Sequence, residues 1–107
     1  MSATLGDHFV HAEEARVDSL EKLKTYLTEA EQRDVKRDEF SDLFALSLRV
    51  LELDHEAAAR LFKTSRPTVS RWAAGQSAPH MLGRSAVFRA LRKVASDRIR
   101  QHPVAMG

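Results

Sequence analysis

Two guanidinium groups and three hydroxyl groups lie within residues 65–71, whose sequence is Ser-Arg-Pro-Thr-Val-Ser-Arg. No acidic residue occurs between Glu56 and Asp97 that would neutralise them from nearby in the sequence. Guanidinium and hydroxyl groups donate hydrogen bonds to anionic oxygens, and an arginine can also donate two to the edge of a guanine. The residue types in this run therefore predict contacts with phosphate groups and base edges.

Two short helices with a break at residues 63–65 must position these side chains. Asp54 can cap the first helix and Ser65 the second, because carboxylate and hydroxyl oxygens accept the free N–H groups of a first turn. Pro67 fits that first turn, where its missing N–H costs little. Gly75 provides the left-handed residue that ends many helices.

Apolar residues recur at helical spacing in both helices of this pair, and we expect them to pack the two helices together. They are Ala58, Leu61 and Phe62 in the first helix and Val69 and Trp72 in the second. The arginines and hydroxyl groups are then left on the outer face of the second helix.

Residues 53–79 resemble the helix-turn-helix of the Cro and lambda-repressor-like (XRE-type) DNA-binding domains, and residues 40–99 do so more loosely. The match is carried by Leu53, Glu56, Ala59, the run Ser65-Arg66-x-Thr68-Val69-Ser70-Arg71-Trp72, Gly75 and Pro79. Lys63 replaces the glycine usual at the turn, and a lysine at positive φ would cost on the order of 1 kcal/mol. The resemblance implies an all-α fold, a lambda-repressor-like helix-turn-helix bundle with an added N-terminal helix.

The same resemblance implies sequence-specific binding of double-stranded DNA, with residues 66–74 in the major groove. Pro67 occupies a position where many relatives place a polar residue that reads bases, so base recognition is expected to depend on Arg66 and Arg71. The other candidate DNA contacts, mainly to phosphates, are Ser65, Pro67, Thr68, Ser70, His55, Lys63 and Arg60.

Charge is divided unequally between the two halves of the chain. Residues 1–56 hold 7 Lys/Arg and 14 Asp/Glu, a net charge of −7, whereas residues 57–107 hold 10 Lys/Arg and one Asp, a net charge of +9. A basic half is the electrostatic pattern expected of a nucleic-acid binder. A solvated surface could segregate charge in the same way, but the arginine-containing run at 65–71 favours the first interpretation.

The acidic N-terminal extension, residues 1–37, contains one expected helix at residues 12–32, and the residues before it are expected to fray. Charged residues, Glu31 among them, are expected on the outer sides of this helix. Its narrow apolar stripe, which cannot stabilise an isolated helix, consists of Val17, Leu20, Leu23, Leu27 and Ala30. The stripe must be buried against the rest of the chain, a second copy or a different partner, and these three alternatives stay open.

The DNA-binding domain is expected to span residues 38–101, followed by a tail at 102–107. Asp38 can cap its first helix, residues 39–51, whose apolar residues cover more than half of the circumference. Its last helix is expected to begin at residue 84 or 85 and to end at residue 100. That helix should have Val87, Leu91, Val94 and Ala95 on its inner face, with Phe88 and Ile99 beside them.

Catalytic and metal-binding chemistry find little support in the sequence. The chain has no cysteine, so disulfides and thiolate metal ligands are excluded. His55 and Glu56 begin like a zinc-protease helix, but Ala59 stands where that motif needs a second histidine. His8 and His11 could hold a metal ion only with a third ligand. We therefore expect no enzymatic activity, no metal site and no cofactor.

The N-terminus lacks the basic flank and apolar stretch of a secretion signal, and no apolar run approaches the ~18 residues of a membrane span. These features predict a cytoplasmic protein without membrane contact. The expected function is transcriptional regulation, with a repressor as the simplest form by family resemblance. A homodimer on a palindromic operator is expected, because one such module buries too little surface for useful specificity.

Two other functions remain open from the sequence. An antitoxin of a toxin–antitoxin pair would repress its own operon with the same domain and hold a basic toxin through the N-terminal helix. A non-regulatory adaptor would instead bind protein through the helix-turn-helix surface, but a basic recognition face without acids argues against it.

Overall fold

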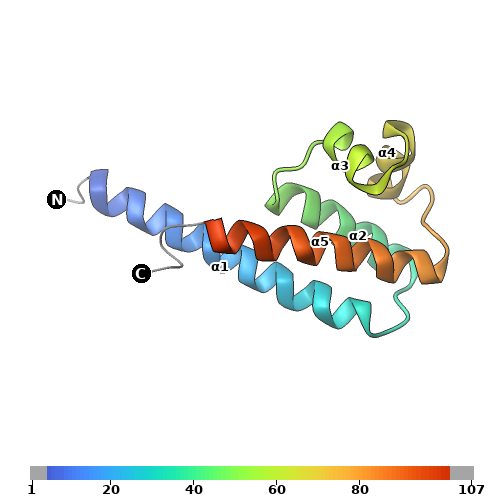
Figure 1. Cartoon of the computed structure of the whole chain (residues 1–107), viewed down its shortest axis with the longest axis horizontal. Helices are drawn as coiled ribbons and strands as arrows, with labels where there is room; N and C mark the ends of the chain where they lie inside the picture. Colours follow the sequence, from blue (N-terminus) through green and yellow to red (C-terminus); the bar gives the residue numbers. More distant parts are fainter. Residues whose placement is uncertain (1–4, 102–107) are drawn as a thin grey trace.

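The computed structural model describes the backbone of residues 5–101 and the side chains of residues 15–101, and this part of the chain is all-helical. The helices are α1 (Leu5–Glu31), α2 (Arg37–Val50), α3 (His55–Phe62), α4 (Arg66–Ala74) and α5 (Met81–Gln101). As Figure 1 shows, the short helices α3 and α4 lie together at one end, above the longer helices. The expected all-α class is confirmed.

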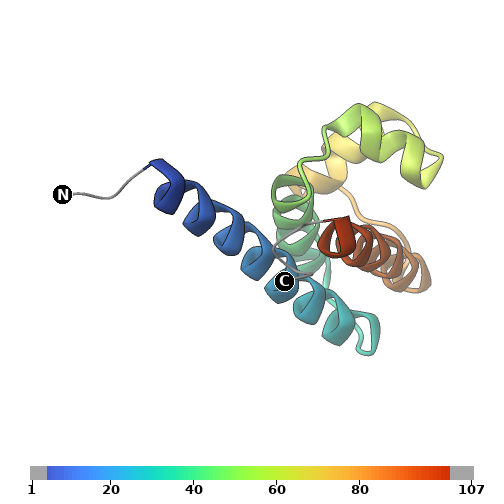
Figure 2. The ribbon, with the colours of Figure 1, turned by 60° about the vertical axis from the view of Figure 1, so that its left-hand side comes forward.

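The two longest helices, α1 and α5, make the most extensive contact and run antiparallel (Figures 1 and 2). Their contact explains how the narrow apolar stripe of α1 is buried. Within the stripe Val17 stays half-buried, whereas at most 2% of the surface is exposed for Leu20, Leu23, Leu27 and Ala30. The chain itself therefore covers the stripe, which settles one of the alternatives that the sequence left open.

Glu31, expected on the outer side of α1, is instead largely buried against α5. Its side chain is only 12% exposed and lies between Arg89 and Arg92. Arg92 Nε donates to Glu31 Oε2, and Arg92 Nη2 at 3.3 Å and Arg89 Nε at 3.4 Å both donate to Oε1. Hydrogen bonding from Arg92 is the main cause that lowers the pKa of Glu31, and the pKa of Arg92 is raised in return.

An aromatic cluster fills the space where α2 meets the other helices. Phe40 and Phe44 of α2, Phe62 of α3, Trp72 of α4 and Phe88 of α5 form ring pairs whose centroids lie 5.4–6.3 Å apart. Phe88 is fully buried, not at the flank of the inner face as expected, because α5 contacts α2 as well as α1 and so buries a wider face.

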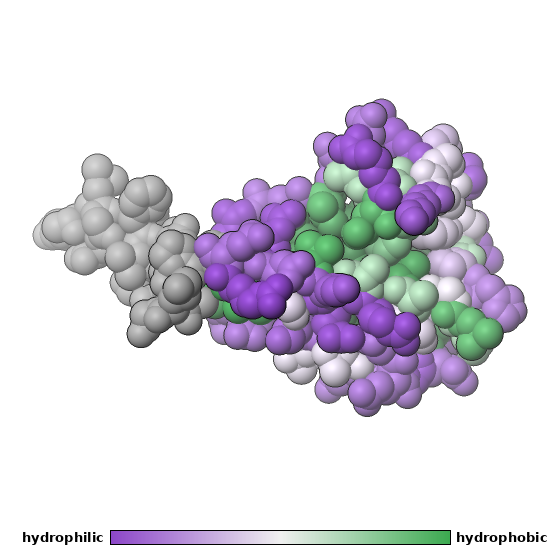
Figure 3. Space-filling model, viewed as in Figure 1, coloured by the Kyte–Doolittle hydropathy of each residue, from purple (hydrophilic) through white to green (hydrophobic). Residues whose placement is uncertain are grey.

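A single hydrophobic cluster joins buried residues of all five helices, so the core continues across the expected boundary at residue 37. Half-buried apolar side chains surround this cluster. Figure 3 shows hydrophobic surface between α5 and the α3–α4 pair, with hydrophilic residues over the outer side of α5. The division into residues 1–37, 38–101 and 102–107 stays a prediction.

Three helix starts differ from expectation. α1 is already helical from Leu5, so residues 5–11 do not fray, while residues 1–4 and the tail at 102–107 lie outside the described residues. The N-cap of α2 is Lys36, not Asp38, because the Lys36 backbone N–H donates to the Glu39 carboxylate. α5 begins at Met81, ahead of the expected start at residue 84 or 85.

Candidate nucleic-acid interface

Helix α3 begins and ends as its sequence indicates. Asp54 Oδ1 accepts the N–H of Ala57 at 2.7 Å, and Lys63 at the C-terminal end adopts the left-handed conformation with φ 54° and ψ 47°. Ala58 is fully buried against α4, but Leu61 is 38% exposed. The expectation that Leu61 packs inside was wrong, since more than a third of its surface is exposed.

Helix α4 has the expected cap at each end. Ser65 Oγ accepts the N–H of Thr68 at 3.2 Å, Pro67 lies in the first turn, and Gly75 ends the helix with φ 79°. Gly75 also lies close to α2, because a Cβ there would be 3.3 Å from Ser41 Oγ, which would have to shift by a few tenths of an ångström. Val69, expected in the core, is fully buried.

Trp72 fixes the orientation of α4 on the rest of the molecule. It is half-buried, and its ring makes edge-to-face contacts with Phe40, Phe44 and Phe62, at centroid distances of 6.0, 5.6 and 6.3 Å. Ser41 Oγ adds a hydrogen bond to the carbonyl of Ala73 at 3.3 Å. With one side of α4 anchored in this way, its other side faces solvent.

The solvent-facing side of α4 carries most of the candidate site. Ser65, Arg66, Pro67 and Arg71 are exposed and Thr68 is half-buried. Thr68 Oγ1 lies 2.8 Å from Ser65 Oγ and accepts a hydrogen bond from Arg71 Nη2 at 3.2 Å. These contacts hold the Arg71 guanidinium along the helix. Arg66 has no hydrogen bond or ion pair with another described side chain.

His55 and Ser70 form a contact with each other that the sequence does not reveal. His55 Nδ1 lies 2.8 Å from Ser70 Oγ, and both residues are half-buried. This contact links the first residue of α3 to α4. The two side chains were expected to contact DNA separately. Their contact with each other instead helps to fix how α3 lies against α4.

The cationic side chains of the α3–α4 pair have no carboxylate partner in the described part of the chain. Arg60, Lys63, Arg66 and Arg71 are all exposed, and no ion pair to any of them exists among residues 15–101. Several arginines elsewhere do form ion pairs, as Arg16 does with Glu52 and Arg33 with Glu39. The surface therefore presents positive charge that is available to an anionic ligand.

Two further arginines hold the loop that follows α4. The Arg37 guanidinium donates to the carbonyl of Gln76, and Arg84 donates to the carbonyls of Pro79 at 2.9 Å and Val35 at 2.8 Å. Neither arginine was expected to take part in the site. Their acceptors are backbone carbonyls, most of them distant in the chain, so residue type and spacing give no signal.

No group of His, Asp and Glu suited to holding a metal ion occurs among residues 15–101. The side chains of His8, His11 and His102 lie outside the described residues. None of the described helices combines the length and apolarity needed to cross a membrane. Comparisons of the chain with protein-family models, with curated proteins and with solved structures give no match.

Proposed function

We propose that the chain is a sequence-specific regulator that binds double-stranded DNA, with α3 and α4 acting as a helix-turn-helix of the lambda-repressor type. The observation that carries this proposal is the solvent-facing side of α4. Two exposed guanidiniums, Arg66 and Arg71, lie there among hydroxyl groups and have no carboxylate partner among the described residues.

The spacing along α4 suits a helix in the major groove. In this binding mode the N-terminal residues of the second helix contact base edges, and the first helix lies across the backbone. Arg66 is the first residue of α4. Arg71 follows about 7.5 Å along the axis, at 1.5 Å per residue, so the two can reach different base pairs.

The remaining candidates are assigned to the DNA backbone. Arg60 lies in the last turn of α3, Lys63 and Ser65 lie between the two helices, and Thr68 lies in the first turn of α4. Their cationic and hydroxyl groups can bind phosphate oxygens. His55 and Ser70 support the interface by fixing α3 against α4. Repression follows if the bound protein occupies an operator, and a homodimer on a palindrome supplies the contact area that one module lacks.

Selection of bound sites from a random DNA pool tests the proposal. The wild-type protein should enrich a two-fold symmetric motif whose half-sites are about one helical turn, roughly 10 base pairs, apart. An Arg66→Ala/Arg71→Ala variant should fail to enrich that motif while retaining its helical circular dichroism. A wild-type pool indistinguishable from the input would refute DNA recognition.

An antitoxin is the second candidate function, and one observation bears on it. The apolar stripe of α1 is already buried within the chain, so a toxin would have to bind other parts of the acidic N-terminal half. Sedimentation with the product of a neighbouring reading frame would distinguish this candidate from a simple repressor.

A further inference from the structure

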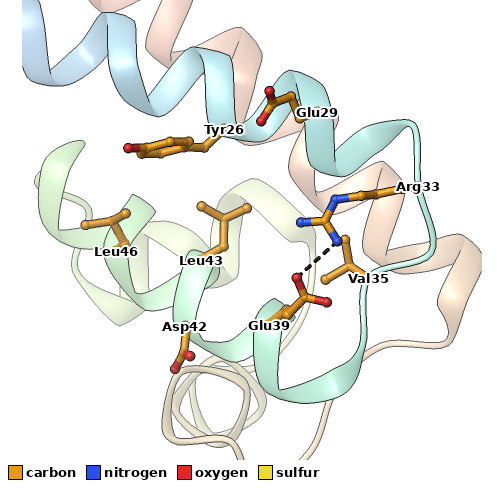
Figure 4. Close-up of a pocket in the computed structure, with 8 residues that line it drawn as sticks. All are labelled: Tyr26, Glu29, Arg33, Val35, Glu39, Asp42, Leu43 and Leu46. Atoms are coloured by element: carbon orange, nitrogen blue, oxygen red, sulfur yellow. Dashed lines mark ion pairs between the residues drawn. The ribbon is translucent and has the colours of Figure 1, made fainter.

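A groove with a volume of about 320 Å³ lies between the C-terminal part of α1 and one face of α2 (Figure 4). Its apolar surface comes from Tyr26, Val35, Leu43 and Leu46. Tyr26 is 51% exposed, and the two leucines are half-buried. The Tyr26 ring faces the leucines across the groove in Figure 4, so the apolar surface between α1 and α2 remains open to water.

Carboxylates surround this apolar surface. Glu29 of α1 and Asp42 of α2 line the groove, are exposed, and form no ion pair with any residue in the range 15–101. Glu39 pairs with Arg33 at 3.0 Å at one end of the groove, and the hydrogen bond from Arg33 is the main cause that lowers the pKa of Glu39. The groove is therefore lined by three carboxylates and one guanidinium, and its net charge is negative.

The groove and the candidate DNA surface lie on opposite sides of α2. Glu39, Asp42, Leu43 and Leu46 share one helical face, whereas Phe40, Ser41 and Phe44 point to the other side, where α4 packs. A ligand in the groove therefore leaves the solvent-facing side of α4 uncovered. DNA itself is repelled from the groove by the carboxylates.

We propose that the groove binds a basic segment of a partner protein. The segment inserts one apolar side chain between Tyr26 and the leucines of α2, and its lysine or arginine residues pair with Glu29 and Asp42. Buried aromatic anchors supply much of the affinity at protein interfaces, and complementary charge at the rim supplies specificity. The volume is at the lower end of the range for small-molecule pockets, as suits one anchoring side chain.

The test uses a random peptide library displayed on phage as the probe and the full-length protein as bait. Enriched peptides should carry an apolar residue flanked by Lys or Arg. Glu29→Gln/Asp42→Asn should weaken the selected peptide by roughly tenfold, because two charge pairs are lost. Glu21→Gln/Glu56→Gln removes the same charge from exposed sites outside the groove, and its affinity should stay within about twofold of wild type.

Tyr26→Ser tests the apolar part of the site at an exposed position, where the fold should tolerate the change. It should also weaken the selected peptide by roughly tenfold, because the anchor loses its aromatic contact. Failure to enrich basic peptides, or an equal loss in both double variants, would overturn the proposal. A wild-type dimer that Tyr26→Ser converts to a monomer without peptide would also overturn it, because a second copy would then occupy the groove. No readout involves DNA, so this proposal and DNA binding can fail separately.

Discussion

His55 Nδ1 lies 2.8 Å from Ser70 Oγ, so a side-chain contact joins the first residue of α3 to α4. Both residues are half-buried, and the contact lies outside the aromatic cluster around Trp72. The cluster holds α4 on the core and, through Phe62, on the end of α3, and the His55–Ser70 contact adds a link at the start of α3. In the proposed complex, the angle between α3 and α4 determines whether α4 can enter the major groove of DNA while α3 lies across the DNA backbone.

His55→Ala and Ser70→Ala should each lower the free energy of unfolding by about 1 kcal/mol, the usual contribution of one hydrogen bond. The double variant should cost clearly less than the sum, because both changes remove the same interaction. Urea denaturation of the four proteins measures this. Strictly additive losses would show that the two side chains do not interact in solution.

Arg66→Ala should weaken binding to the selected DNA site by about 1–3 kcal/mol and relax the preference at one base, because a bidentate contact to guanine is lost. Arg60→Ala is the matched control, since Arg60 is exposed on α3 and is assigned to phosphate. It should weaken all sequences equally and reduce the salt slope by about 1. Titrations with specific and random DNA decide between these roles. An equal loss on both DNAs for Arg66→Ala would refute base recognition.

Trp72→Ala should lower the free energy of unfolding by about 3–5 kcal/mol, because it removes an aromatic side chain that contacts three phenylalanines. Trp72→Phe keeps one ring in that space and should cost clearly less. Thermal melting followed by circular dichroism is the measurement, since Trp72 is the only tryptophan in the chain. A melting curve of Trp72→Ala close to wild type would contradict the anchoring role.

The local features of the candidate site could be predicted from the sequence because each depends on a few neighbouring residues. The caps at Asp54 and Ser65 and the left-handed Gly75 are confirmed for this reason. Apolar spacing likewise identified the buried Val69. Lys63 at positive φ also follows from its place in the turn.

Contacts between distant elements could not be predicted in the same way. The pairing of Glu31 with Arg92 depends on how α1 lies along α5, and the His55–Ser70 contact depends on the angle between α3 and α4. Many polar side chains could serve as the partner in each case, and only the packed helices select one. The start of α5 at Met81 could not be predicted either, because the preceding residue, His80, is not one of the usual capping types.

Glu31→Gln should lower the free energy of unfolding at neutral pH by roughly 1 kcal/mol, between the values for an exposed ion pair and a buried charged hydrogen bond. The pKa of Glu31 is lowered in the folded state by Arg92. Its stabilisation is therefore present above the ordinary pKa of 4.5 and is lost as pH falls through the folded value. Urea denaturation across pH should show a constant gap at neutral pH that closes in acid.

The control for this pH dependence is Glu21→Gln, which changes an exposed carboxylate of α1 without an ion pair among the described residues. It should leave stability unchanged. If Glu31→Gln were as destabilising at strongly acidic pH as at neutral pH, packing and not charge would be responsible for its effect.

Lys63→Gly should raise the free energy of unfolding by roughly 0.5–1 kcal/mol, because glycine adopts the left-handed φ of 54° without steric cost. Lys63→Ala is the matched control: it removes the same charge but keeps the Cβ, and its stability should be close to wild type. Both variants should lose the same phosphate contact, so the salt slope of DNA binding should fall by about 1 in each. Chemical denaturation and salt-dependent titrations separate the two effects. A glycine variant no more stable than the alanine variant would show that the turn carries no strain, and unchanged salt slopes would remove Lys63 from the interface.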